Sequence, residues 1–407
     1  MSLFGTNLEH GQRYNRRVVL ESVRLHGPLS RAEIARRTGL SAQTVSNIMD
    51  QLKPADLVVE HPRRTGGRGQ PPIDIQINPK GAFAFGISFD QSQLKVIVVN
   101  LGGEVCGEIE FALTHSGPGI LLPLIESAVN ELTAARSIPS ERIWGAGVVL
   151  PTLVSRGSLT SLGPTVVPEW RGFPLAAKLQ ERLGFPVLVD NDATAGAIGE
   201  LLYGAGRRLS DFFYFYIGVG LGGGIVANGR PYRGAYGMSG ELAHVVSVPD
   251  GRACACGNKG CLERYASLSA AHGALTGREE GSELVDLKRI AAAFASKDRK
   301  LMRWIEDCSG HLRNAIVSVE NLLDPEAVIV GGLIPDAMLD MLLATIAPLP
   351  PSVSSRHSRE APRLLKAAVG LDTRALGAAA LAMFDSMTPD FSSMMKQRVA
   401  TDGASIR

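Results

Sequence analysis

The stretch Gly240-Glu241-Leu242-Ala243-His244, followed by Cys254-Ala255-Cys256-Gly257-Asn258-Lys259-Gly260-Cys261-Leu262-Glu263, decides how the chain is interpreted. Three of the five cysteines of the chain lie in this stretch, and a histidine precedes them. One imidazole nitrogen and three thiolate sulfurs form a complete ligand set for tetrahedral structural zinc. Buried free cysteines and a capping histidine are the alternative, but such clusters rarely arise without a metal. We therefore expect a structural zinc ion bound by His244, Cys254, Cys256 and Cys261.

Two glutamates, Glu241 and Glu263, flank the expected metal ligands. Closing the loop around a metal would bring their carboxylates together, next to the imidazole of His244. Carboxylates accept hydrogen bonds and an imidazole donates or accepts one, so fixed groups of this kind suit the hydroxyls of a polyol. The metal loop therefore indicates a nearby site for a sugar-like ligand.

Composition and charge restrict the class of protein. No apolar stretch approaches the roughly 18 residues that span a bilayer, and no signal-peptide core is present near the start. Cys106 and Cys308 are isolated, which fits a reducing compartment, so we expect a cytoplasmic protein without membrane insertion. Residues 1–80 contain 12 lysines and arginines against 7 acidic residues, whereas the remainder has 30 against 33. The basic excess therefore lies in the N-terminal segment, although charge by itself is weak evidence for nucleic-acid binding.

The first 80 residues have the pattern of a winged helix. Apolar periodicity predicts a helix over 14–25, and Ser30 with Glu33 forms a capping box that begins a second helix. Gly39 is placed for a tight turn, and Ser41 caps a third helix that runs to about Leu52. Short polar side chains on the outer face of this third helix suit base edges in a major groove, namely Gln43, Thr44, Ser46 and Asn47.

Two alternating strands follow, at 57–60 and 73–77, with a basic glycine-rich segment at 61–72 between them. This segment is typical of the wing of a winged helix, and its Arg68 suits DNA phosphates or a narrow minor groove. We assign 1–80 as a DNA-binding domain for a double-stranded operator. A small helical protein-interaction module is the alternative.

From residue 81 the pattern becomes α/β. Strands are predicted at 82–88, 94–100 and 143–150, with a helix near 119–136. A buried strand at 185–189 ends at Asp190-Asn191-Asp192, where open α/β sheets bind ligands. Asp192 is therefore a candidate general base for a hydroxyl, although an Asn-Asp pair before a helix equally predicts an N-cap.

Glycines follow two further predicted strands. The strand at 212–217 leads into a glycine run at 218–224, and the strand at 327–330 leads into Gly331-Gly332. Glycines allow a phosphate to approach the backbone closely, but they also permit a tight connection between strands. Helices are predicted near 297–322 and at 375–382, the second rich in small residues.

Taken in order along residues 12–385, these motifs resemble the ROK family, in particular its repressor type. The resemblance implies a winged helix followed by a two-lobed actin-like, sugar-kinase (ribonuclease H-like) body at 81–388, which forms homodimers or homotetramers. It also implies that the four expected metal ligands bind zinc. The sugar-binding groups of the family correspond to Asn191, Asp192, Glu241, His244 and Glu263.

The chain departs from the kinases of this family. Their body begins with an Asp-x-Gly-Gly-Thr turn that positions metal and the γ-phosphate, and the corresponding residues here are Ser88-Phe89-Asp90-Gln91-Ser92. Both glycines and the leading carboxylate are replaced, and Val219 stands where a threonine is usual. Phosphoryl transfer depends on positioning and charge stabilisation, so we expect no kinase activity. The sugar-binding side also departs, at Thr152 and in the loop 162–165.

We therefore predict a DNA-binding transcriptional regulator, most simply a repressor of carbohydrate genes, that responds to a sugar or sugar-derivative effector. An active sugar kinase with a DNA-binding appendage is one alternative. Another is a regulator controlled by a protein partner, for which the tail at 389–407 offers an amphipathic pattern, although a fraying terminus fits it better. The apolar positions of that tail are Phe391, Met394, Met395 and Val399.

Overall fold

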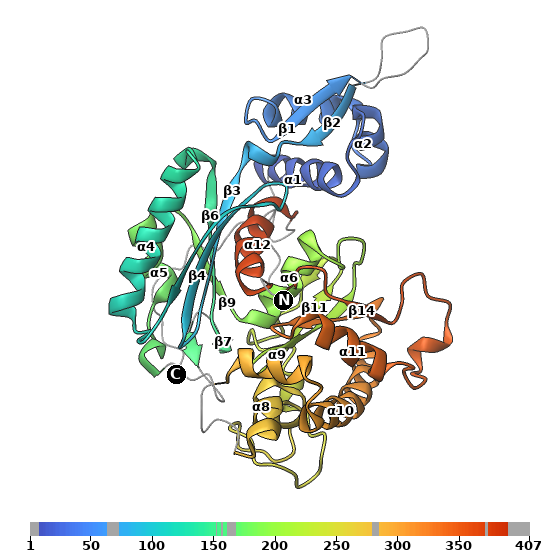
Figure 1. The fold of residues 1–407 in the computed structure, drawn as a ribbon. Helices are drawn as coiled ribbons and strands as arrows, with labels where there is room; N and C mark the ends of the chain where they lie inside the picture. Colours follow the sequence, from blue (N-terminus) through green and yellow to red (C-terminus); the bar gives the residue numbers. More distant parts are fainter. Residues whose placement is uncertain are drawn as a thin grey trace, which may run out of the picture. The chain divides into compact units, whose positions relative to one another are not determined.

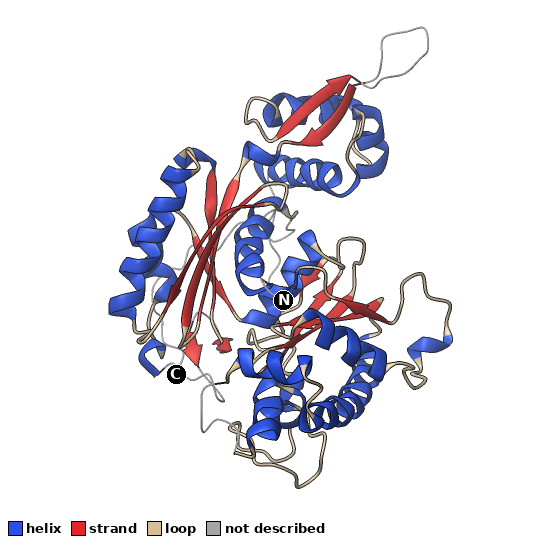
Figure 2. Ribbon diagram, in the orientation of Figure 1, coloured by secondary structure: helices blue, strands red, loops and turns tan. Residues whose placement is uncertain are grey.

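The computed structural model describes residues 8–62, 73–151, 153–155, 158–160, 168–278, 285–370 and 373–389. These residues form two compact units. The first contains the residues up to Ala82 and those from Phe384 onward, and the second is Phe83–Met383. Both units contain helices and strands (Figures 1 and 2). The division into domains at 1–80, 81–388 and 389–407 stays a prediction.

The first unit contains the predicted three helices and two-stranded sheet, which are α1 (Leu8–His26), α2 (Arg31–Thr38), α3 (Ala42–Leu52), β1 (Val58–Pro62) and β2 (Ile73–Ile77). Ser30 and Glu33 form the predicted capping box, and Gly39 has a φ of 68°, a conformation that favours glycine. The helix α1 begins earlier than predicted. Its first turns are polar and show no apolar periodicity, so the sequence pattern did not indicate them. Of the apolar residues in the predicted helix, Leu25 is 36% exposed, whereas Leu20 is buried.

The first half of the second unit is a five-stranded sheet in the order β5-β4-β3-β6-β9. Its strands are β3 (Phe83–Phe89), β4 (Gln93–Asn100), β5 (Val105–Ala112), β6 (Ile143–Val149) and β9 (Val187–Asp190). Side chains alternate along β3, so Phe85 and its neighbours of the same parity pack with α4 (Pro118–Ala135) and α5 (Leu175–Leu183). The opposite face packs against α12 (Thr373–Met387), as Figure 1 shows. A separate small hairpin is formed by β7 (Leu153–Ser155) and β8 (Ser158–Thr160).

The second half has a sheet in the order β12-β11-β10-β13-β14. Its strands are β10 (Phe212–Ile217), β11 (Leu221–Ala227), β12 (Arg230–Pro231), β13 (Ala327–Gly332) and β14 (Leu364–Lys366). One face packs against α6 (Asp192–Tyr203), where a Cβ at Gly222 or Gly224 would collide with Ala193. The other face of the sheet packs against α7 (Glu263–Ala266), α8 (Leu268–Thr276), α9 (Leu287–Ala295), α10 (Arg299–Leu323) and α11 (Asp336–Ile346).

The two sheets share one topology. In each, the first three strands are antiparallel neighbours, and two later strands add in parallel on the other side of the first. This repeated arrangement is the predicted two-lobed, ribonuclease H-like α/β fold, which is thereby confirmed. The chain leaves the first sheet at the end of β9 and enters α6, which packs on the second sheet. Asn191 and Asp192 therefore lie where the chain crosses between the lobes.

Among the described residues, no helix combines the length and apolar character needed to span a membrane. The segment Phe391–Val399, for which a docking helix was considered, lies outside the described residues.

Candidate ligand and metal site

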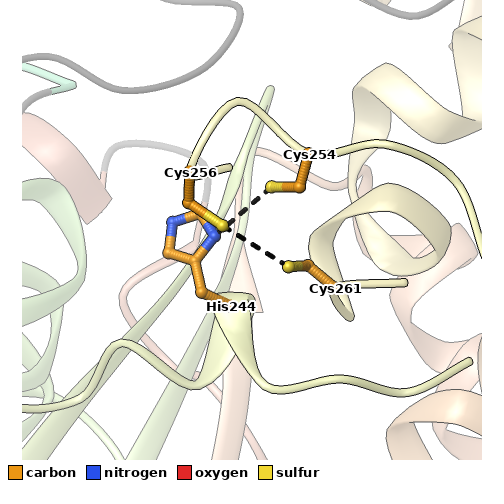
Figure 3. Close-up of side chains that lie close together, drawn as sticks. All are labelled: His244, Cys254, Cys256 and Cys261. Atoms are coloured by element: carbon orange, nitrogen blue, oxygen red, sulfur yellow. Dashed lines mark hydrogen bonds between the residues drawn. The ribbon is translucent and has the colours of Figure 1, made fainter. Parts of the chain in front are cut away.

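The four expected metal ligands come together in one cluster. The ligand atoms of His244, Cys254, Cys256 and Cys261 all lie within 4.8 Å of one another, and Figure 3 shows the side chains facing a common centre. His244 ends the short 3-10 turn Leu242–His244. Gly257 and Gly260 have φ values of 95° and 76°, which let the chain reverse between the second and third cysteines.

The spacing within the cluster fits a tetrahedral zinc ion. The Sγ atoms of Cys256 and Cys261 are 3.6 Å apart, and the Cys254 Sγ is 3.6 Å from the His244 Nδ1. Zinc bonds of about 2.3 Å to sulfur and about 2.0–2.1 Å to nitrogen give tetrahedral edges of roughly 3.6–3.8 Å. The Nδ1 atom of His244 therefore faces the cluster, which leaves Nε2 for another partner.

Asn191 and Asp192 begin α6, but they divide their roles differently from the prediction. Asn191 is the N-cap, because its side-chain oxygen accepts the N–H of Thr194 at 2.7 Å. Asp192 is the first helical residue, and its carboxylate accepts the N–H of Ala193 at 3.0 Å. The N-cap predicted from the Asn-Asp pair is thus Asn191, and Asp192 already belongs to the helix. Burial raises the pKa of Asp192 to about 6, although the nearby charge of Arg374 acts in the opposite direction.

Glu241 and Glu263 lie close together, as the metal loop predicted, and both lie near Asp192. Burial raises the pKa of Glu241 to about 7, and the charges of Asp192 and Glu263 add to this effect. Burial also raises the pKa of Glu263, whose carboxylate accepts the N–H of Leu221 at 3.3 Å. Three carboxylates in a poorly hydrated region repel one another, so hydroxyl donors of a ligand would be favourable partners there.

The turn that replaces the kinase phosphate loop contains an ion pair. Ser88 is a buried residue of β3, and Asp90 follows the strand. The Asp90 carboxylate lies 2.9 Å from the Nη1 of Arg374, in the first turn of α12. Arg374 was not predicted as a site residue. A single arginine at the start of an alanine-rich helix was the signal in the sequence.

A cavity of about 330 Å³ lies beside this ion pair. Asp192 contributes to its wall together with Val219 and Gly220 of the β10–β11 turn. Tyr216 also contributes, and its buried hydroxyl has no hydrogen-bond partner among the described residues. Gly220 approaches the Glu263 carboxylate closely, since a Cβ there would lie 2.7 Å from its Oε1. The cavity and the acidic cluster around Glu241 are therefore neighbours.

The third helix of the first unit presents the expected face. Val45, Ile48, Met49 and Leu52 are buried, and Ser41 accepts the N–H of Thr44. Gln43 and Asn47 are exposed and hydrogen-bond to each other at 2.9 Å, while Thr44 and Ser46 are half-buried. The four polar residues therefore share the outer face of α3. Arg68, Thr152 and the loop 162–165 lie outside the described residues.

Comparisons with known proteins agree with this arrangement. The model of the ROK family matches residues 85–384, and that of the MarR family matches residues 17–69. The xylose repressor of Caldicellulosiruptor bescii is 30% identical over 335 residues, which cover 78% of this chain and 82% of that protein. The glucokinase of Halalkalibacterium halodurans is 30% identical over 261 residues, which cover 61% of this chain and 79% of that enzyme.

Among solved structures, a ROK family transcriptional regulator described as a homologue of the E. coli MLC protein is similar over almost the whole chain. It has a TM-score of 0.72 and 25% identity, with coverage of 93% of this chain and 98% of that one. The similarity therefore includes the N-terminal helices as well as the two-lobed body.

Proposed function

Because the chain belongs to the ROK family, we propose that it is a DNA-binding repressor of sugar uptake or sugar metabolism genes that leaves its operator when a sugar-like effector binds. The observation that carries this proposal is the presence of a MarR-type helix-turn-helix unit and a ROK body in one chain. The similar solved structure is described as a ROK family transcriptional regulator, and the xylose repressor matched over 78% of this chain is a repressor by name.

We infer that α3 reads the operator. Its outer face carries Gln43 and Asn47, whose amides can form paired hydrogen bonds with adenine, beside the hydroxyls of Thr44 and Ser46. Arg68 of the wing would contact phosphates or the minor groove. Repressors of this kind bind two-fold operators as dimers, so a homodimer or homotetramer is part of the proposal.

The effector would bind at the crossover between the lobes. Hydroxyl groups would donate to the carboxylates of Asp192, Glu241 and Glu263. The amide NH2 of Asn191 is left to donate, because its oxygen is used by the helix cap. His244 would offer its Nε2, since Nδ1 faces the cysteines. Closure around such a ligand would change the spacing of paired winged helices and lower operator affinity by linkage.

Zinc would be held by His244, Cys254, Cys256 and Cys261. With four protein ligands it has no open position, so it would rigidify the loop rather than take part in a reaction. The chain's own contribution is orientation: the loop fixes the ring of His244, and Cys261 directly precedes the segment that leads to Glu263 in α7.

We propose that the protein is not an enzyme, because Ser88, Asp90 and Val219 replace groups that position phosphate in the kinases. A sugar kinase is the second candidate, favoured by the glucokinase similarity and by the retained Asp192. ATP consumption in the presence of any sugar would establish it. Control by a protein partner in place of a sugar would be indicated by operator release without any small ligand.

The deciding experiment is operator selection followed by release. The full chain is loaded with zinc and used to select duplexes from a random pool, and binding of the selected duplex is then measured against a panel of neutral sugars that includes xylose. We expect one sugar class to weaken binding without nucleotide. Asn47→Ala should weaken operator binding by about 5- to 150-fold, equivalent to about 1–3 kcal/mol for a lost base contact.

The matched control is Lys178→Ala, an exposed residue of α5 paired with Glu181 in the body. It should leave operator affinity unchanged. If Asn47→Ala binds the selected duplex as tightly as the unmodified chain does, α3 is not the reading helix. If no duplex is enriched from the pool, the repressor proposal fails.

A further inference from the structure

The turn after β3 binds an anion that the chain itself provides. The Asp90 Oδ1 accepts the N–H of Ser92 at 2.8 Å, the hydroxyl of Ser92 at 2.7 Å and the N–H of Gln93 at 3.1 Å. The Asp90 Oδ2 accepts from Arg374 at 2.9 Å. Both carboxylate oxygens are thus occupied by donors of this chain, and among the described residues Asp90 is the hydrogen-bonding partner of the Arg374 guanidinium.

These donors are of the kind that bind phosphate. Backbone N–H groups of a tight turn, a hydroxyl and a guanidinium together form a typical oxyanion site. Here the side chain of Asp90 takes the position of the oxyanion. The pair is largely shielded from water, with side-chain exposures of 8% for Arg374 and 20% for Asp90. Burial acts to raise the pKa of Asp90, but Arg374 and the Ser92 donors outweigh it, so the pKa lies below its ordinary value and the ionised form is favoured.

The remaining lining of the cavity favours neutral hydrogen-bonding groups. Asp192 contributes a second carboxylate, and the buried hydroxyl of Tyr216 lacks a partner among the described residues. At the rim, the exposed Lys288 is accompanied by Asp286, which caps α9. A phosphate in this cavity would therefore meet two carboxylates, and it would compete with Asp90 for the N–H groups of Ser92 and Gln93 and for the Nη1 of Arg374. A ligand hydroxyl, in contrast, could bond to Asp192 and Tyr216.

We propose that Asp90 is a built-in anion that fills the phosphate-binding turn, so that the cavity accepts an uncharged, hydroxyl-bearing ligand and excludes phosphorylated ones. This inference deepens the proposed function, on which it rests for the role of the ligand: it assigns the effector to neutral sugars rather than sugar phosphates or nucleotides. Asp90 is the residue that determines this specificity, and Arg374 is the cation it neutralises.

The first test uses the unmodified chain. Thermal unfolding is followed while inorganic phosphate, Mg-ATP or sodium chloride of equal ionic strength is added, because a ligand of the folded state raises the melting temperature by mass action. We expect phosphate and Mg-ATP to act no differently from chloride. Saturable stabilisation of the unmodified chain by either would overturn the proposal.

The second test uses Asp90→Asn, which keeps the shape and one acceptor oxygen but removes the charge. The freed Arg374 should then bind inorganic phosphate at least about tenfold more tightly than in the unmodified chain, in line with the strength of guanidinium–phosphate pairs. The double variant Asp90→Asn/Arg374→Gln should lose this gain. Glu181→Gln, an exposed acid of α5, is the matched charge control and should gain nothing.

Asp90→Gly, which restores the residue type of the kinase turn, serves as a second variant should Asp90→Asn fold poorly. A folded Asp90 variant that fails to gain phosphate binding would overturn the proposal. These measurements use neither operator nor sugar. Their failure therefore leaves the operator-release result intact, and failure of operator release leaves the phosphate result readable.

Discussion

The loop at 244–261 and the turn at 90–93 differ in how their polar groups are satisfied. Both are connecting segments of the two-lobed unit in which several polar groups lie close together. In the loop, four ligand atoms face one point and lie within 4.8 Å of one another, an arrangement that suits a cation from outside the chain. In the turn, Asp90 satisfies the donors around it from within the chain.

Under the proposed function, this difference would let the fold keep ligand recognition without group transfer. A zinc ion bound by the loop would hold its side chains rigidly and leave the second nitrogen of His244 for a ligand. In the turn, the N–H groups of Ser92 and Gln93, the Ser92 hydroxyl and the Nη1 of Arg374 already donate to Asp90 and would have to leave it to bind a phosphate. We therefore expect substitutions at the turn to alter phosphate binding while the strand order of both sheets stays the same.

The largest effect is expected when the loop loses a ligand. Cys256→Ala should abolish zinc binding, lower stability by several kcal/mol, since structural zinc contributes on the order of 10 kcal/mol in small domains, and eliminate effector response. Metal content, thermal unfolding and sugar-induced operator release measure the three effects. Cys106→Ala, at a half-buried cysteine outside the cluster, is the control and should retain zinc. Normal effector response in a zinc-free Cys256→Ala protein would show that the loop needs no metal.

A smaller effect is expected at Asp192, which lines the cavity beside the Asp90–Arg374 pair and also lies near Glu241. Its pKa of about 6 exceeds the ordinary 3.8, so its contribution to stability is fully present below about pH 4 and is lost as pH rises through 6. Asp192→Asn removes this dependence. Its stability relative to the unmodified chain should therefore increase from pH 4 to pH 7, by at most about 3 kcal/mol, since a tenfold change in proton affinity is worth about 1.4 kcal/mol.

Urea unfolding of both zinc-loaded proteins across this pH range measures the difference. Glu306→Gln, at an exposed position of α10, is the control for removing an acidic group. A stability difference that stays flat with pH would show that Asp192 ionises as it does in water, and that the crossover is well hydrated.

The smallest effect is expected at Ser92, which donates its hydroxyl to Asp90 at 2.7 Å. Ser92→Ala removes this one bond while the backbone donors and Arg374 remain, so a loss of about 1 kcal/mol is expected. Ser318→Ala, at an exposed serine of α10, should change stability by less than about 0.5 kcal/mol. Chemical denaturation measures both. A loss for Ser92→Ala as large as that for Cys256→Ala would contradict the view that the turn is satisfied many times over.

The sequence predicted those parts of the site whose residues are close together along the chain. The spacing of the three cysteines after His244 indicated the metal cluster, and Ser30 with Glu33 indicated the start of α2. The ion pair of Asp90 with Arg374 joins residues 284 positions apart, and no local pattern indicates such a contact. The exchange of roles between Asn191 and Asp192 depends on the residue at which α6 begins, which apolar periodicity leaves uncertain by one position.

The shared strand order of the two sheets has a mechanical consequence. The chain crosses between them after β9 and returns before α12, and the cavity is lined near both crossings, by Asp192 and by Arg374. A molecule bound there would contact residues beside both crossings at once. We expect that a small backbone shift at the crossings would displace the far ends of the two lobes by a larger distance.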